Sequence, residues 1–157
     1  MKVTLLSVGK TDNDLFSRII EEYEKRINFY LPFETAFVAD VKNRKGLSLT
    51  ELKEREGQNL LAFLQPTDRV VLLDENGKQF DSPGFARYLQ KRMHSVPKRL
   101  VFIVGGPYGF SKELYDRAHE KLSLSPMTFT HQMVRMIFTE QLYRALTILN
   151  NEPYHHE

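Results

Sequence analysis

Apolar and polar positions along the chain alternate between two kinds of segment, short apolar runs and longer amphipathic stretches. The apolar runs are rich in β-branched and aromatic residues and predict strands over Lys2–Val8, Phe33–Val41, Arg69–Asp74 and Arg99–Val104. The last two are apolar throughout and are bounded by polar residues, which is typical of strands buried on both faces of a sheet.

The amphipathic stretches between these runs predict helices. Residues from about 14 to 29 repeat apolar side chains every four positions, and residues from about 132 to 150 carry a wide apolar stripe. Further helices are expected from about 48 to 64, from residue 82 onward and, as a short element, after residue 111. Strands that alternate with helices predict a parallel sheet covered on both faces, in an α/β fold.

Local signals set several of the expected boundaries. Thr50 and Ser82 are the expected N-caps of their helices, and Ser111 is the expected cap of the short one. The dipeptide Asn76-Gly77 predicts a turn after the third strand. We find no internal repeat and no linker, so a single domain over residues 1–157 is expected.

Composition narrows the chemistry. The chain has 157 residues, 41% hydrophobic and 27% charged, which is typical of a globular cytoplasmic protein. No apolar run approaches the roughly 20 residues that a membrane-spanning helix needs. Cysteine is absent, so disulfides, thiolate nucleophiles and Cys-ligated metals are excluded, and the five histidines form no metal-binding pattern. The net charge of +2 neither requires nor excludes a nucleic-acid partner.

Three segments reach the edge of the predicted sheet where ligands bind in open α/β folds, beyond the carboxyl ends of the strands. They are "VVLLDENGK" (70–78), "GGPYG" (105–109) and "LSLSPMTF" (122–129). The glycines allow close approach of backbone to a ligand, but their spacing fits neither a dinucleotide fingerprint nor a phosphate loop. On spacing alone, a tight turn explains the glycine loop and an ordinary connector explains the small-residue loop.

Other polar features have ordinary explanations as well. "KNRKG" (42–46) and "QKRMH" (90–94) are basic stretches, for which a solvated surface is the usual interpretation and contact with RNA phosphates the rival one. Glu140 and Arg144 have the spacing of an exposed helical ion pair. The terminal "NNEPYHHE" (150–157) is typical of a frayed end when composition alone is considered.

Four segments in order carry a resemblance to a known family. "VVLLDENGK", "FIVGGPYGFS", "LSLSPMTFTHQMVRMIFTEQLYRALTI" and the terminal "PYHHE" resemble the RlmH family, the SPOUT-class methyltransferases that modify pseudouridine N3 in large-subunit ribosomal RNA. The resemblance covers the whole chain and is strongest from residue 69 onward. No single one of these motifs is specific, but their order and the matching C-terminus are.

The resemblance implies properties that hydrophobic periodicity does not reveal. The fold would be an α/β knot with a deep C-terminal trefoil, an exception to the usual rules of chain connection. The protein would be a homodimer that uses S-adenosylmethionine as methyl donor and no metal. Its substrate would be a pseudouridine in a 23S rRNA stem-loop near the decoding centre, methylated on assembled ribosomes.

The family's site residues can be carried over by position. Substrate handling falls on Arg144, Tyr154 and His155, and the tail that bears the last two would end beside the cofactor pocket. The cofactor-binding positions are Leu73, Gly105, Leu124, Ser125, Pro126, Met127, Thr128 and Phe129. Pro126 and Met127 are not the residues most common there, and His156 stands where relatives often have a permanently charged arginine or lysine.

Two other classes of function stay open. One is a non-catalytic ribosome- or RNA-binding module on the same fold, since a fold does not fix a function. It predicts no affinity for S-adenosylmethionine. The other is a flavodoxin-like nucleotide-binding regulator, which the spacing of "GGPYG" disfavours.

Overall fold

A computed structural model of the chain describes residues 1–156. Five strands form one sheet: β1 (Lys2–Val8), β2 (Phe33–Val38), β3 (Arg69–Gln79), β4 (Arg99–Val104) and β5 (Glu120–Ser123). Five helices connect or follow them: α1 (Asp14–Ile27), α2 (Leu49–Phe63), α3 (Ser82–Ser95), α4 (Lys112–Arg117) and α5 (His131–Leu149). The strand order is β2-β1-β4-β3-β5 and every pairing is parallel, which confirms the predicted α/β class.

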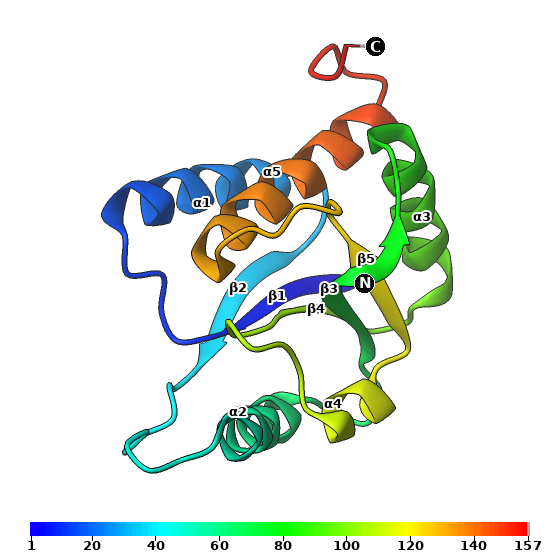
Figure 1. Ribbon diagram of the computed structural model, residues 1–157. Coiled ribbons are helices and arrows are strands. Elements are labelled where there is room, and N and C mark those ends of the chain that lie inside the picture. The colour runs from blue at the N-terminus through cyan, green and yellow to red at the C-terminus, as the bar shows by residue number, and fades with distance from the viewer. Residues whose placement is uncertain (157) are drawn as a thin grey trace.

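Helices cover both faces of the sheet (Figure 1). Helices α1, α3 and α5 pack on one face, and α2 and α4 pack on the other. Side chains of neighbouring residues on the central strands point to opposite faces of the sheet. Phe102 packs in the first core, between the sheet and α1, α3 and α5, and Ile103 packs in the second, between the sheet and α2 and α4. This explains why the central strands are apolar at every position. The Phe102 and Phe138 ring centroids lie 4.6 Å apart in the first core, and burying one such side chain stabilises the fold by about 1.5–3 kcal/mol.

The turn predicted at Asn76-Gly77 is wrong, because β3 runs on through both residues. After an irregularity between Leu73 and Lys78, the strand pairs again with β5, with Lys78 opposite Leu122. A Cβ atom on Gly77 would come within 2.5 Å of the Leu122 nitrogen. The glycine therefore serves close strand approach at a bulge, and the extended β3 forms one wall of the site described below.

Two expected helix caps are also wrong. Asp81, one residue before Ser82, caps α3, and its Oδ1 accepts a bond of 2.7 Å from the Gly84 amide. Ser48 caps α2 in place of Thr50, in a reciprocal capping box with Glu51. Each cap satisfies amide groups that the first helical turn leaves free.

The expected cap of α4 is confirmed, since the Ser111 hydroxyl accepts from the Leu114 amide at 3.3 Å. No helix within residues 1–156 combines the length and the apolar character needed to cross a membrane. The trefoil knot stays a prediction, because strand order and pairing do not define how the chain crosses itself.

Candidate functional site

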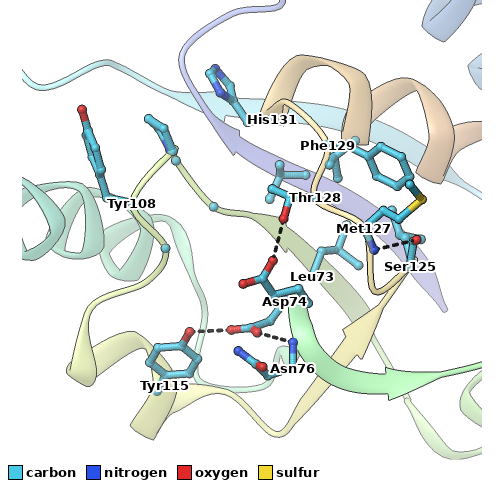
Figure 2. A pocket seen from close by; sticks show the side chains of 18 residues that line it. Leu73, Asp74, Asn76, Tyr108, Tyr115, Ser125, Met127, Thr128, Phe129 and His131 are labelled. Carbon is cyan, nitrogen blue, oxygen red and sulfur yellow. Dashed lines mark hydrogen bonds between the residues drawn. The ribbon is translucent and has the colours of Figure 1, made fainter.

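A cavity of about 470 Å³ opens at the carboxyl edge of the sheet, between the ends of β3 and β4 and the loop that joins β5 to α5. This volume lies within the usual range for small-molecule and cofactor pockets. All three segments that the sheet-edge argument selected contribute to its walls (Figure 2). The pocket is therefore a product of topology, which brings the ends of parallel strands to one edge.

The glycine loop after β4 forms one wall. It turns tightly, with the Gly109 amide donating to the Gly106 carbonyl at 3.2 Å and with Gly109 at a φ of 86°. That backbone conformation strains any residue with a side chain. At Gly105, an added Cβ would lie 3.1 Å from the Phe110 ring, so this position also has little room.

Carboxylates at the irregularity within β3, between Leu73 and Lys78, form a second, acidic wall. Asp74 accepts from the Asn76 amide at 2.8 Å and from the Tyr115 hydroxyl. Thr128 donates its hydroxyl to Glu75 at 2.9 Å and so ties the opposite loop to β3. Figure 2 shows Thr128 above the end of β3 and Tyr115 to its lower left. These bonds hold the two carboxylates at the mouth of the pocket.

The loop of residues 124–129 forms the third wall and is shaped by short polar bonds. The Ser125 hydroxyl accepts from the Met127 amide at 3.0 Å, and the Ser125 carbonyl accepts from the Ser123 hydroxyl at 3.0 Å. Met127 is 75% exposed and Phe129 is 37% exposed, so both apolar side chains face outward at the rim. A rim of this kind has apolar surface to offer a ligand or a second protein chain.

The first residues of α5 close the remaining side. His131 and Val134 line the pocket. Arg135 is buried and donates from Nη1 to the Gly9 carbonyl and from Nη2 to the Val8 carbonyl, both at 2.8 Å, which fixes α5 to the end of β1. Burial and the neighbouring Arg135 charge lower the pKa of His131, so the pocket wall holds a neutral imidazole at pH 7.

The structure brings nearly all of the predicted cofactor positions together. The pocket is lined by Leu73, Gly105, Leu124, Ser125, Met127, Thr128 and Phe129, while Pro126 is not among its lining residues. Sequence reasoning selected the end of β3 as a segment but missed Asp74 and Glu75 as individual residues, and it missed Tyr115 altogether. For Asp74 and Glu75 the sequence did offer a signal, since both acidic residues are at the end of an apolar run that predicts a buried strand. Tyr115, on α4, carried none.

The predicted substrate-handling residues form a separate cluster at the far end of α5. Tyr154 donates its hydroxyl to Glu140 at 3.0 Å and lies 3.1 Å from the hydroxyl of Tyr23. Arg144 pairs with Glu140 at 2.5 Å and contacts the Nδ1 of His155 at 3.2 Å. The Glu140–Arg144 pair is thus no isolated surface pair, since the two side chains are only 21% and 24% exposed and both bind the tail.

Further contacts hold the tail in place and set its protonation. The Tyr30 hydroxyl donates to Glu152 at 2.6 Å, and the Tyr143 and Tyr154 rings pack edge to face with centroids 4.7 Å apart. Burial, then the bonds to Tyr23 and Glu140, raise the pKa of Tyr154 well above its ordinary value. The bond to Glu140 raises the pKa of Arg144. The cluster therefore presents a protonated phenol and a cation.

The tail does not end beside the pocket of its own chain, which corrects the expectation from the resemblance. None of Arg144, Tyr154 and His155 lines the pocket. At a rise of 1.5 Å per residue, Arg144 lies roughly 20 Å along α5 from His131. Figure 1 shows the C-terminus beyond the last turn of α5, away from the loops that form the pocket.

An open parallel sheet with a cofactor-sized pocket at its carboxyl edge defines an α/β ligand-binding protein. Among residues 1–156, no group of three or more His, Asp or Glu side chains is placed to hold a metal ion. A family model described as "Predicted SPOUT methyltransferase" matches residues 1–155. The chain belongs to the SPOUT methyltransferase family, and it is a methyltransferase.

Curated relatives match over the full length of the chain. The Ribosomal RNA large subunit methyltransferase H of Parabacteroides distasonis is 59% identical over 157 residues, covering 100% of both chains. The protein of that name from Flavobacterium psychrophilum is 54% identical with the same coverage, and that from Bacteroides fragilis is 52% identical. These similarities confirm the resemblance drawn from the motifs.

Proposed function

We propose that the chain transfers a methyl group from S-adenosylmethionine to N3 of a pseudouridine in 23S rRNA, in the large-subunit stem-loop near the decoding centre. The observation that carries the proposal is the coincidence of the pocket with the cofactor positions implied by the family motifs, of which only Pro126 lies outside the lining. The relatives' name, which specifies the RNA of the large subunit, supports the same substrate class.

The residues of the pocket fit the methyl donor. Leu73, Val104 and Leu124 supply apolar surface for a flat heterocycle, and Gly105, which has no side chain, exposes its backbone in the same pocket. Asp74 and Glu75 supply acceptors that suit ribose hydroxyls or a cationic group. A pocket that recognises its ligand largely through backbone tolerates the unusual Pro126 and Met127.

The bound donor supplies an electrophilic methyl carbon on a sulfonium. The protein must hold N3 in line with that carbon, and orientation of this kind supplies much of the acceleration. Transfer would form the N3–CH3 bond as the S–CH3 bond breaks, the N3 proton would pass to solvent water, and a neutral thioether would be left in the pocket. The Arg144 cation is suited to stabilise the anionic ring. Tyr154 is kept protonated and is not the base; it donates its one hydroxyl proton to Glu140 and so positions the carboxylate that holds Arg144.

A homodimer reconciles the pocket with the distant tail. Leu15 and Ile19 are 67% and 40% exposed on α1, beside α5, and Met127 and Phe129 are exposed at the pocket rim. Exposed apolar side chains such as these are suited to meet a second copy across a two-fold axis. A two-fold axis perpendicular to α5 makes the two α5 helices antiparallel, so the first residues of one α5 lie beside the last residues of its partner. The tail of one protomer then lies toward the pocket of the other.

The experiment that tests the function uses ribosomes from cells that lack this modification. The protein and labelled S-adenosylmethionine are incubated with intact 70S ribosomes and, in parallel, with free 23S rRNA, and the labelled base is mapped by mass spectrometry. We expect one N3-methylated pseudouridine, formed on the assembled ribosomes. A labelled uridine would revise the substrate, and the absence of label in large-subunit rRNA would refute the proposal.

The competing function, a non-catalytic RNA-binding module, is tested in the same preparation. Such a module binds ribosomes but has no affinity for S-adenosylmethionine. Isothermal titration of the protein with S-adenosylmethionine separates the two, and we expect saturable binding.

A further inference from the structure

The two basic stretches of the sequence lie at opposite edges of the sheet. The segment Lys42–Gly46 follows β2 and precedes α2, so it extends beyond the carboxyl edge, where the pocket opens. The segment Gln90–His94 forms the last turns of α3, which returns to the amino edge before β4 begins. Figure 1 shows the first in cyan at the lower left and the end of α3, in green, on the right.

The stretch on α3 is partly used for structure. Arg92 is paired with Glu120 at 2.6 Å and lies over the Tyr88 ring, 4.9 Å from its centroid, with a side chain 17% exposed. Its charge is therefore paired within the protein and is not available to a partner. Lys91 and His94 are exposed but face away from the pocket edge. A solvated surface is a sufficient explanation for this stretch.

The loop Lys42–Gly46 differs in both respects. All of its residues are exposed, and two of them, Asn43 and Gly46, adopt positive φ values of 57° and 84°, which bend the loop sharply. Within residues 1–156, Lys42 and Lys45 form no ion pair, while Arg44 is paired with Asp40 at 3.1 Å. The loop thus presents two uncompensated ammonium groups and one partly compensated guanidinium.

This loop also lies close to the pocket. Arg44 is paired with Asp40, whose Oδ2 lies 2.6 Å from where a Cβ on Gly9 would stand, and the Gly9 carbonyl accepts from Arg135, next to Val134 of the pocket wall. Burial raises the pKa of Glu56 and the Arg44 charge opposes that rise, and the Glu56 carboxylate lies against Gly106 of the glycine loop, 2.8 Å from where a Cβ would stand. Lys10 is exposed at the end of β1, and its carbonyl accepts from Gln132 in the first turn of α5 at 3.4 Å.

We propose that Lys10 and the loop Lys42–Gly46 bind the phosphates of the rRNA segment that presents its base to the pocket. The inference rests on the proposed function. Contacts to phosphates provide much of the affinity for nucleic acid and fix its register, while base recognition is left to the catalytic pocket. A local basic loop serves this purpose without a high net charge, which is only +2 for the whole chain.

The test compares two double substitutions that remove the same charge. The test variant is K42Q/K45Q, in the loop. The control is K91Q/K98Q, two exposed lysines at or near the amino edge of the sheet. Initial rates of methylation are measured against ribosome concentration at several salt concentrations, and S-adenosylmethionine binding is measured by calorimetry.

For K42Q/K45Q we expect a roughly tenfold rise in KM for ribosomes with little change in kcat, because two phosphate contacts are lost. The salt dependence should become shallower, by about 1.5 in the slope of log(kcat/KM) against log salt. Cofactor affinity should stay that of the wild type. The control variant should match the wild type in all three measurements.

The outcomes separate this inference from the function on which it rests. If the wild type methylates ribosomes but K42Q/K45Q behaves like K91Q/K98Q, the phosphate surface is refuted and the function stands. An equal rise in KM for both variants also refutes the phosphate surface, since the change in net charge alone then explains the rise. If the wild type methylates no ribosomes, both proposals are refuted. The charge-reversed variant K42E/K45E should show a still larger rise in KM than the glutamine variant.

Discussion

The pocket and the tail cluster stand at opposite ends of α5 and are built by different means. The pocket is formed by loops and strand segments, with glycine backbone, apolar side chains and two carboxylates in its walls. The tail cluster is formed by long polar and aromatic side chains that bind one another, with Glu140 at the centre of bonds from Arg144 and Tyr154. Sites of the first kind enclose a ligand, whereas the second kind offers donors and charge to a substrate.

This difference means that each region can be damaged without the other. Damage to the pocket should abolish cofactor binding and, with it, methylation. Damage to the tail should leave cofactor binding intact and reduce methylation alone. The predictions below use this separation, beginning with the largest expected effect.

The largest effect is expected for Gly105→Val. Its Cβ would stand 3.1 Å from the buried Phe110 ring, so the larger side chain must displace the glycine loop that forms one wall of the pocket. We expect S-adenosylmethionine affinity to fall more than about 100-fold, as measured by calorimetry, because the displaced loop no longer shapes that wall. Thermal unfolding controls for loss of the fold, and the milder Gly105→Ala should be intermediate. Unchanged affinity in a folded Gly105→Val protein would contradict the assignment of the pocket.

Deletion of residues 153–157 is the matching change at the tail. We expect methylation of ribosomes to fall about 100-fold, the scale expected when a group that stabilises transition-state charge is lost. Cofactor affinity should stay within about threefold of the wild type, since no residue described in this segment lines the pocket. Full activity of the shortened protein would show that the tail has no role in catalysis.

A smaller effect is expected for Tyr154→Phe, which keeps the ring but removes the bonds to Glu140 and Tyr23. We expect kcat to fall about tenfold with no change in cofactor affinity, because Glu140, and with it Arg144, loses a bond that positions it. Tyr30→Phe is a matched control, since it removes another tyrosine-to-carboxylate bond of the tail, to Glu152. A loss in Tyr30→Phe as large as that in Tyr154→Phe would mean that tail anchoring explains the effect.

The smallest effects concern pH and distinguish the two ends of α5. The folded-state pKa of His131 is lowered, so folding binds fewer protons and the free energy of unfolding should fall as pH decreases through about 6.5. The pKa of Tyr30 is raised to about 12, mainly by its bond to Glu152, so the free energy of unfolding should fall as pH increases above 10. Urea unfolding across pH measures both.

Single substitutions show which residue causes the acid decline in the free energy of unfolding and which causes the alkaline one. His131→Asn should make the decline on the acid side shallower, and Tyr30→Phe should do so on the alkaline side. If His131→Asn leaves the acid decline in the free energy of unfolding unchanged, protonation of His131 does not destabilise the folded protein.

The sequence selected most of the residues that line the pocket but not the placement of the tail, for a physical reason. Leu73 and Gly105 are brought together because β3 and β4 are parallel neighbours, with Leu73 opposite Val104, and the apolar runs of the sequence predicted a parallel sheet. The position of Tyr154 depends on the length of α5 and on side-chain bonds to Tyr23 and Glu140, which no local pattern encodes. The motif placed Tyr154 in a site without indicating which pocket it serves.

Local misjudgements arose where one signal has two causes. Asn76-Gly77 is typical of a turn, but a glycine also permits the close approach of β3 to β5 at a bulge. Asp81 and Ser82 are both good N-caps, and only the bond from Gly84 decides between them. For α2, Ser48 and Glu51 have the spacing of a capping box, which is a more specific signal than Thr50 alone.

The claim that one protomer's tail serves the other's pocket is tested most directly by mixing two inactive variants. Gly105→Val lacks a working pocket, and the protein shortened by residues 153–157 lacks a tail. After subunit exchange in equal amounts, half of the dimers carry both variants, and each has one intact pocket facing one intact tail. We predict about a quarter of wild-type ribosome methylation, as random pairing in a two-fold dimer implies. Activity no greater than that of either variant alone, with subunit exchange demonstrated, would contradict the account.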